Sequence, residues 1–282
     1  MKKSLLAVAM AATLVAACAP EKEAKAAGVT VYGSAEQALT TTNGVSDLAS
    51  GDNYIGFNAS EDFGNGTGAF AKIELGVDPE GTNTMSTRES FVGLNLNGLT
   101  ITAGKQKNLE KVMLNGLVDI FEGNSVTTAN QARVNNAVSA VTSVGSVTVG
   151  AASITEGTSG EDGVDAYELG AKGEIAGLTA VVTYTKNQTT DADSVSYGAS
   201  TTFGGLTVGA TMEPDSDTNT VAGSMDFGAN TVKVATQMVD GGNDTNVAEL
   251  QHNFSKNTNA YVNWSKEDGS DASTMVGMRI TF

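Results

Sequence analysis

The sequence predicts an all-β fold: a closed antiparallel barrel of sixteen strands with its third long loop folded inward. Three observations lead to this prediction. From Gly28 onward, apolar and polar residues alternate with a period of two, the pattern of strands with one apolar and one polar face. The connections alternate between seven tight turns and eight longer polar loops. Fifteen connections join sixteen strands, and a sheet of that size must close to pair its edges.

The alternation is clearest in Val147–Ala152, Leu206–Glu213 and Ser273–Phe282, where apolar residues occupy every second position. Each expected strand is about ten residues long, the length that a tilted strand needs to cross a lipid bilayer. A barrel of this size is too wide for side chains to fill, so its polar face lines water. Its apolar face then requires an apolar surrounding phase, which a membrane supplies.

Turn-forming residues define the expected strand boundaries, because Asn and Gly tolerate the positive φ that short hairpins need. The tight turns are expected at 64–66, 97–98, 144–145, 176–177, 204–205, 229–230 and 256–257, and the longer connections at 40–50, 78–86, 106–130, 156–165, 187–193, 213–219, 239–244 and 265–272. Because the two kinds alternate, the first and last strands lie at the same end and can meet.

The N-terminal residues are expected to be a leader. In one interpretation residues 1–26 are a secretory signal peptide, because lysines precede a charge-free apolar run and Ala24-Lys25-Ala26 offers a cleavage site. In the other, residues 1–17 are a lipoprotein leader, Cys18 is acylated and 18–27 is a linker, because the spacing before Cys18 resembles a bacterial lipobox. Both place the barrel over 27–282, and a secreted chain has an outer membrane available.

The composition excludes several classes of protein. The chain has 16 Lys and Arg against 32 Asp and Glu, a formal net charge of −16. This acidity excludes nucleic acid as a partner, because contacts to phosphates need clustered cations. A single Cys and a single His exclude a Cys/His zinc site and leave little for histidine catalysis, so no enzyme is expected. A soluble β-solenoid is disfavoured because no fixed short repeat is present.

Several segments match a known pattern, in the same order along the chain. They are Val29–Ser34, Asn53–Gly66, Ser86–Leu94, Leu99–Gln106 and the terminal Phe282 on an alternating strand. Together they resemble the Gram-negative general porin family, in motif over 28–150 and at the C-terminus, and in layout only between. The resemblance implies a homotrimer of sixteen-stranded channels in which the third loop folds into the lumen and narrows it.

The connection 106–130 is about twice as long as the others, and such a loop is usually functional. It carries Glu110, Asp119 and Glu122, together with apolar residues that need a surface to pack on. Folding inward against the barrel wall supplies that surface, and staying outside as a lid is the alternative. Residues 118–123 are similar to the constriction segment of the family, which implies that Asp119 and Glu122 lie near the narrowest point of the pore.

The resemblance also implies cations on the facing wall. Arg88 and Arg133 align with family arginines that open the fourth and sixth strands, and by alternation Lys72 and Glu74 share the polar phase of their strand. The chain has few other arginines, so the field across the pore should be biased negative. A narrow aqueous pore lined by carboxylates favours cations, most strongly at low ionic strength. We therefore expect a weak to moderate cation preference.

The outer connections form a second acidic feature. Their oxygen-rich turns could bind Ca²⁺, although none is a full EF-hand loop. The candidate ligands are Asp215, Asp217, Asp240, Asp244, Asp268 and Asp271. A solvated negative surface, or divalent ions that bridge these loops to lipopolysaccharide, are the alternatives. No other cofactor is expected.

The sequence therefore predicts a Gram-negative outer-membrane porin through which small hydrophilic solutes and cations diffuse passively. Its expected partners are outer-membrane lipids, lipopolysaccharide and two further copies of the chain. The alternative is a structural or adhesive barrel whose acidic loops bind Ca²⁺ or lipopolysaccharide and in which residues 107–122 fill the pore as a plug. A third possibility is a soluble secreted β-protein.

Overall fold

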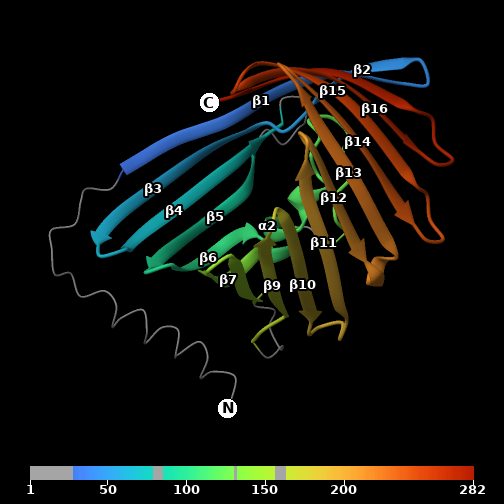
Figure 1. Cartoon of the computed structure of the whole chain (residues 1–282). Helices are drawn as coiled ribbons and strands as arrows, with labels where there is room; N and C mark the ends of the chain where they lie inside the picture. The colour runs from blue at the N-terminus through green and yellow to red at the C-terminus, as the bar shows by residue number, and fades with distance from the viewer. Residues whose placement is uncertain (1–27, 79–84, 130–131, 156–162) are drawn as a thin grey trace.

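The computed structural model describes residues 28–78, 85–129, 132–155 and 163–282. Within these residues the strands form one antiparallel sheet that closes on itself (Figure 1). The strands are β1 (Gly28–Thr42), β2 (Val45–Ser50), β3 (Tyr54–Gly64), β4 (Thr67–Val77), β5 (Met85–Leu96), β6 (Leu99–Lys107), β7 (Arg133–Val144), β8 (Val147–Ile154), β9 (Ala166–Ile175), β10 (Leu178–Asn187), β11 (Asp193–Phe203), β12 (Leu206–Glu213), β13 (Thr218–Phe227), β14 (Asn230–Val239), β15 (Thr245–Ser255), β16 (Thr258–Glu267) and β17 (Ser273–Thr281). The short helices are α2 (Leu109–Met113), η1 (Asn115–Leu117) and η2 (Pro214–Ser216).

The barrel closes where the first and last strands meet. Ser34 of β1 lies opposite Thr281 of β17, and the pairing continues to Thr42 opposite Ser273. The C-terminal Phe282 extends this ladder, since its backbone N–H and C=O form hydrogen bonds of 3.1 and 3.0 Å with Gly33. Both edges of the sheet are therefore paired, as the sequence predicts.

Strands β2 and β3 form one interrupted barrel strand, which gives sixteen barrel strands in all. The first half of β1 pairs with β3 and the second half pairs with β2. The side chain of Asn53 bridges the interruption, because its Oδ1 accepts from the backbone N of Glu36 at 2.7 Å and its Nδ2 donates to the Glu36 carbonyl at 2.9 Å. The amide thus replaces a backbone pair of the ladder.

The expected long connection at 40–50 is wrong. The chain instead forms the hairpin β1–β2, whose turn residues Asn43 and Gly44 have φ values of 51° and 75°. Most of β2 is exposed. Its apolar residues Val45 and Leu48 are three positions apart, so no alternation with a period of two marks this strand in the sequence. The seven predicted tight turns are found within one residue of their expected places. The leader, Cys18 and residues 79–84 and 156–162 lie outside the described residues.

The two faces of the wall differ in chemistry. In β16, Tyr261 and Asn263 are buried while Val262 and Trp264 are exposed. Val276 and Ile280 of β17 are exposed in the same way. The outer face is thus an apolar band and the inner face is polar, the arrangement of a barrel that crosses lipid. Among the described residues, no helix is long and apolar enough to cross a membrane.

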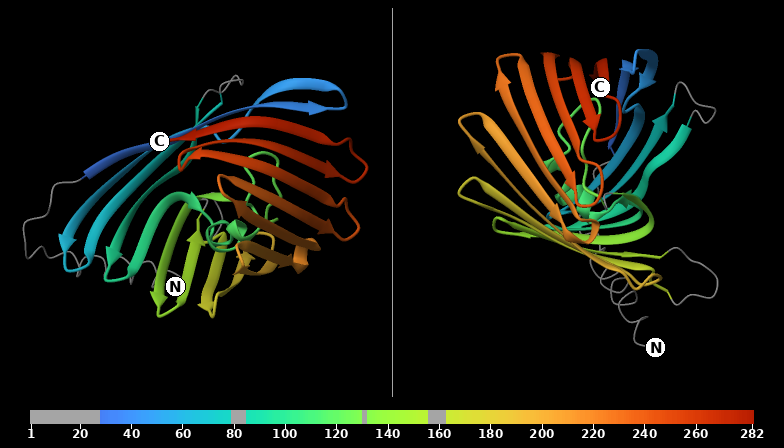
Figure 2. Two further views of the ribbon diagram at one scale, coloured as in Figure 1. Left: turned by 45° about the horizontal axis from the view of Figure 1, so that its top comes forward. Right: turned by 90° about the vertical axis from the view of Figure 1, so that its right-hand side faces the viewer.

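Residues 108–129, called the loop segment below, connect β6 to β7. Figure 2 shows this segment within the ring of strands. It contains α2 and η1 and packs on the inner faces of strands between β8 and β16. The largest apolar clusters of the described residues lie at this contact, so the loop segment supplies what core the barrel has.

Candidate functional site: the charged interior of the barrel

Glycines on the inner wall make room for the first half of the loop segment. A Cβ added at Gly170 of β9 would lie 2.6 Å from the Sδ of Met113, and one added at Gly150 of β8 would lie 3.0 Å from its Cε. A Cβ at Gly198 of β11 would meet the side chain of Leu114 at 2.5 Å. Side chains at these positions would therefore displace the loop segment.

Apolar contacts hold the segment at two places. Leu109, Met113 and Leu114 form a buried cluster with Val181 of β10. The second cluster comprises Val118 and Val126 with Ala222, Ala235 and Val247 on β13, β14 and β15. Because these apolar residues are buried inside the barrel, the inner wall between β8 and β15 is not uniformly polar.

Buried wall glutamates accept hydrogen bonds from the ends of the loop segment. Glu168 of β9 accepts from the backbone N of Leu109 at 3.0 Å, where α2 begins. Asn108 caps the same helix, since its Oδ1 accepts from the backbone N of Lys111 at 3.0 Å. Glu213 of β12 accepts from the backbone N of Ala129 at 2.5 Å, near the other end.

A third glutamate binds the middle of the loop segment, which we call the loop tip (residues 122–125). The carboxylate of Glu249 on β15 accepts from the backbone N of Glu122 at 3.1 Å and of Gly123 at 3.0 Å. It also accepts from Lys233 Nζ at 2.9 Å and from Asn263 Nδ2 at 3.0 Å. The Glu249 side chain is 0% exposed, so four donors replace its water.

Asp119 is engaged within the loop segment itself. Its carboxylate accepts from Asn115 Nδ2 at 2.8 Å and from Ser125 Oγ at 2.5 Å. These bonds close the turn that runs from the end of η1 to the loop tip. Glu110 is buried on α2 and accepts from Ser196 Oγ of β11 at 3.0 Å. Asp119 therefore stabilises the segment internally, and Glu110 attaches it to the wall.

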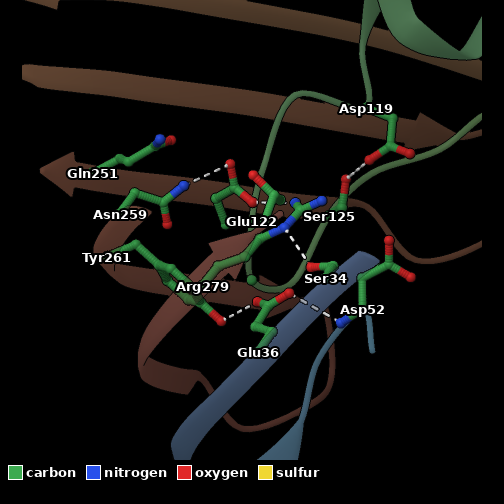
Figure 3. A network of polar contacts seen from close by, with 12 residues as sticks. Ser34, Glu36, Asp52, Asp119, Glu122, Ser125, Gln251, Asn259, Tyr261 and Arg279 are labelled. Carbon is green, nitrogen blue, oxygen red and sulfur yellow. Dashed lines mark hydrogen bonds and ion pairs between the residues drawn. The ribbon is translucent and has the colours of Figure 1, made fainter. Parts of the chain in front are cut away.

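Glu122 forms an ion pair with Arg279 of β17 (Figure 3). The other oxygen of Glu122 accepts from Asn259 Nδ2 at 3.3 Å and lies 4.0 Å from Lys233 Nζ. The Nε of Arg279 also donates to Ser34 Oγ on β1 at 3.0 Å. The loop tip is thus attached to the seam where the first and last strands close the barrel.

Glu36 of β1 forms a neighbouring contact. Its carboxylate accepts from Tyr261 Oη at 2.6 Å and from the backbone N of Asp52 at 2.9 Å, as Figure 3 shows. Asp52 in turn pairs with Arg88 of β5. The seam network is therefore linked to the cluster of charges on the next strands.

A mixed cluster of charges lies on the wall formed by β4 to β7. Glu74 accepts from Arg88 Nε at 2.7 Å and lies 3.4 Å from Lys72 Nζ and 3.6 Å from Arg133 Nη2. Glu89 lies 3.1 Å from Lys72 Nζ and 3.8 Å from Arg133 Nε. The structure therefore brings Lys72, Glu74, Arg88 and Arg133, all singled out in the sequence, into one group.

A β-bulge places Arg88 in this group. Glu74 of β4 lies opposite Glu89, but Leu75 lies opposite Thr87, so Arg88 is the extra residue in β5. Strict alternation from the buried Glu89 would turn Arg88 toward the outer face. The bulge instead directs its guanidinium to Glu74, which is how bulges re-aim side chains. Tyrosine rings complete the wall, with Arg88 4.7 Å from the ring centre of Tyr54.

Lys111 on α2 faces the cations of this wall. Burial lowers the pKa of Lys111 from its usual value of 10.5, and repulsion by Arg133 lowers that pKa further. The negative charge of Asp119 raises the pKa of Lys111. The charge of this lysine is therefore sensitive to the position of the loop segment relative to the β4–β7 wall.

Sequence reasoning missed several charged groups of the interior. Lys233, Glu249 and Arg279 contact the loop tip, and Glu36 and Asp52 connect it to the β4–β7 wall. The signal that could have identified them is a charged residue at an inward-facing position near the middle of a strand. The alternation places Lys233, Glu249 and Arg279 inward, but it does not identify the residues they contact.

The acidic outer turns form hydrogen bonds of their own. Asp215 accepts from the backbone N of Val195 at 2.8 Å, and Asp244 accepts from the backbone N of Val239 at 3.0 Å. Asp217 has a φ of 51° at the end of η2. Among the residues that the structure describes, no group of three or more His, Cys, Asp or Glu is arranged to hold a metal ion.

A closed antiparallel barrel with an apolar outer band and a charged interior defines an outer-membrane β-barrel protein. A family model of the Gram-negative porins matches residues 5–272, and the chain belongs to this family. Membership of the family and the outer-membrane relatives below place the chain in the outer membrane of a Gram-negative bacterium. Membership of this family of channels also agrees with the expectation that the chain is not an enzyme.

The chain is similar to curated outer-membrane proteins over part of its length. It is 42% identical over 110 residues to the major outer membrane protein P.IB of Neisseria gonorrhoeae, covering 37% of this chain and 32% of that protein. It is 34% identical over 125 residues to the protein of the same name from Neisseria lactamica, covering 39% and 35%. The matched region thus spans about a third of these relatives.

Solved porin structures share the fold at low sequence identity. The anion-selective porin from Comamonas acidovorans superposes with a TM-score of 0.73 at 17% identity, covering 91% of this chain and 100% of that one. The trimer form of OmpT from Vibrio cholerae gives a TM-score of 0.70 at 15% identity, covering 92% and 100%. These similarities establish the barrel architecture of the chain.

Proposed function

We propose that the chain is a porin through which small hydrophilic solutes and ions diffuse passively across the outer membrane. The observation that supports the proposal most directly is the charged interior, where ion pairs and carboxylates lie on the inner faces of the wall strands. A barrel that only anchors surface loops has no need of charged groups in its interior, and burying charge is costly. Ion pairs and hydrogen bonds offset this cost at the buried acids, while the side chains of Asp52 and Lys107 remain 45% and 40% exposed, which a water-filled lumen allows.

The proposed path for solutes runs beside the loop segment. The segment occupies the inner wall between β8 and β16, so the open part of the lumen adjoins the β4–β7 wall with Lys72, Arg88 and Arg133. Val112 on α2 is 57% exposed, and it belongs to the surface that solutes would meet. In this proposal the loop segment narrows the lumen without filling it as a plug.

We propose a weak cation preference for this pore. Carboxylates outnumber cations among the groups around the loop segment and on its facing wall. The acids are Glu36, Asp52, Glu74, Glu89, Glu110, Asp119, Glu122, Glu168, Glu213 and Glu249, and the cations are Lys72, Arg88, Lys107, Lys111, Arg133, Lys233 and Arg279. The preference is weak because buried hydrogen bonds and ion pairs engage most of these acids.

We also propose that three copies assemble, as in the trimer form of OmpT from Vibrio cholerae, a structure with the same fold. Outer residues Ala69 and Ala71 of β4 are small, and small side chains allow close packing between subunits. Outer-membrane lipids and lipopolysaccharide would surround the remaining apolar band. We also propose that the aspartates of the acidic outer turns bind Ca²⁺, and this proposal is independent of the channel function.

The test is single-channel current across a planar bilayer with a salt gradient. We expect stepwise openings grouped in threes and a reversal potential that favours cations, most strongly at low salt. Openings with an anion preference would support the channel function but contradict the proposed cation preference. Absence of openings from folded protein in detergent would favour a structural or adhesive barrel instead.

A further inference from the structure

Glu249 occupies an unusual place among the interior acids, because all of its partners are donors and two of them belong to the loop backbone. The donors come from three elements: Glu122 and Gly123 of the loop tip, Lys233 of β14 and Asn263 of β16. An ionised carboxylate offers about four acceptor positions, so these donors saturate it. Its side chain is 0% exposed, and water cannot replace a donor that is lost.

The surrounding contacts are built for close approach. A Cβ on Gly123 would lie 2.8 Å from the Cβ of Asn263, so only glycine allows the backbone to come this near to β16. Asn263 Nδ2 also donates to the carbonyl of Asn124 at 3.0 Å, and Asn124 Nδ2 donates to Ser265 Oγ at 2.8 Å. The tip therefore lies flat against β15 and β16, with Glu249 beneath it.

We propose that Glu249 is a positioning residue whose ionised side chain fixes the loop tip and thereby sets the cross-section of the pore. The proposal rests on the channel function proposed above. Glu249 does not meet solute itself, because Glu122 and Gly123 cover it. It acts through Glu122, whose backbone it binds and whose side chain pairs with Arg279 of β17.

Removing the charge of Glu249 should release the tip. In Glu249→Gln, the side-chain NH₂ group replaces one acceptor oxygen, so it opposes either Lys233 or the backbone N–H groups of the tip. In Glu249→Ala, Lys233 and two backbone N–H groups lose their acceptor. Hydrogen bonds to charged groups are strong enough that losing one shifts the ratio of docked to released tip by about tenfold or more.

Cross-linking measures the position of the tip without reference to transport. Asn124→Cys and Ser265→Cys are introduced together, with Cys18→Ser, and a short thiol–thiol reagent is added to the full-length protein in detergent. We expect the cross-linking rate, which follows the docked fraction of the tip, to fall in Glu249→Gln and Glu249→Ala, and to approach a tenfold decrease where the released state predominates. The matched control is Glu174→Gln, which removes the same charge from an exposed position on β9 and should leave the rate unchanged.

Conductance then tests whether the tip sets the pore. Without the cross-link, we expect the Glu249 variants to show altered single-channel conductance and increased open-state noise. With the cross-link closed, the parent conductance should return, because the covalent bond replaces the contacts of Glu249. A merely structural role in barrel stability would not be rescued in this way.

Two outcomes would overturn the proposal. One is cross-linking in both Glu249 variants at the parent rate, and the other is slower cross-linking with unchanged conductance and noise. If Glu249→Ala does not fold, the more conservative Glu249→Gln decides the question by the same two measurements. If the parent protein itself conducts no current, the proposed function fails, and the cross-linking rates still decide whether Glu249 positions the tip.

Discussion

Arg279 on the last strand and Glu122 on the loop tip form an ion pair across 157 positions of sequence. The same guanidinium donates to Ser34 on the first strand at 3.0 Å. One arginine therefore joins the two strands that close the barrel to the segment that lies inside it. The position of the loop tip and the integrity of the seam depend on each other through this residue.

We expect neutralisation of the two partners to shift ion selectivity in opposite directions. Glu122→Gln should lower the cation preference and Arg279→Gln should raise it, because each removes one charge of known sign from the interior. Reversal potentials in a salt gradient measure both shifts. The double variant should lie near the parent in selectivity, and a double-mutant cycle on unfolding should give a coupling of about 0.5–3 kcal/mol. Equal shifts of the same sign would contradict the pairing.

A larger side chain at Gly170 should displace the loop segment. Gly170→Val would place methyl groups where Met113 packs, which costs about 1–3 kcal/mol of stability for an overpacked site. We expect conductance to rise and open-state noise to increase, measured in single channels. Gly173→Val on the same strand is the control, because a Cβ there meets only Val147 at 3.7 Å. A normal channel from Gly170→Val would show that the segment does not depend on this glycine.

Lys111 should make the pore sensitive to alkaline pH. Burial and then repulsion by Arg133 lower its pKa, so the folded protein releases this proton at a lower pH than the unfolded chain. The unfavourable contribution of the charged lysine is complete below the folded pKa and disappears as pH rises to the unfolded value near 10.5. Stability and cation preference should both increase across that window.

The comparison of Lys111→Met with the parent isolates this lysine from the others that titrate in the same range. The variant should be more stable at neutral pH and should lack the part of the pH response that Lys111 supplies. Denaturant unfolding and reversal potentials between neutral pH and pH near 10.5 measure the two effects. An identical pH response in parent and variant would reject this role for Lys111.

Asp119 and Ser125 should behave as one structural unit. Asp119→Ala or Ser125→Ala removes the bond that closes the turn before the loop tip, and each should destabilise the segment by about 1 kcal/mol. Because both remove the same contact, the double variant should cost little more than either single one. Protease sensitivity of the loop segment measures the effect. Asp119→Asn should alter ion selectivity less than Glu122→Gln does.

The barrel strands could be predicted from sequence because lipid and lumen lie on opposite faces of the wall. That contrast produces the alternation of Val262 and Trp264 with Tyr261 and Asn263. The prediction failed at 40–50, where the β1–β2 hairpin is mostly exposed on β2 and the polar residues no longer alternate with apolar ones. Strand prediction by alternation thus depends on a strand having one apolar and one polar face.

The candidate site could be predicted in part. The acids of the loop segment and the wall charges Lys72, Glu74, Arg88 and Arg133 were identified from position and resemblance. The partners of the loop tip were not, because Glu249 and Arg279 lie more than 120 residues from the tip and only the closed barrel brings them near. The inward direction of Arg88 was also predicted, but the β-bulge that produces it was not.

The way the loop segment is attached leaves two positions available for protein engineering. Val112 is 57% exposed, and a Cβ added at Gly116 would meet nothing within 4 Å. Neither belongs to the apolar clusters that hold the segment in place. New charged, aromatic or metal-chelating groups could therefore be introduced there for sensing or separation, while the attachments that hold the segment remain intact.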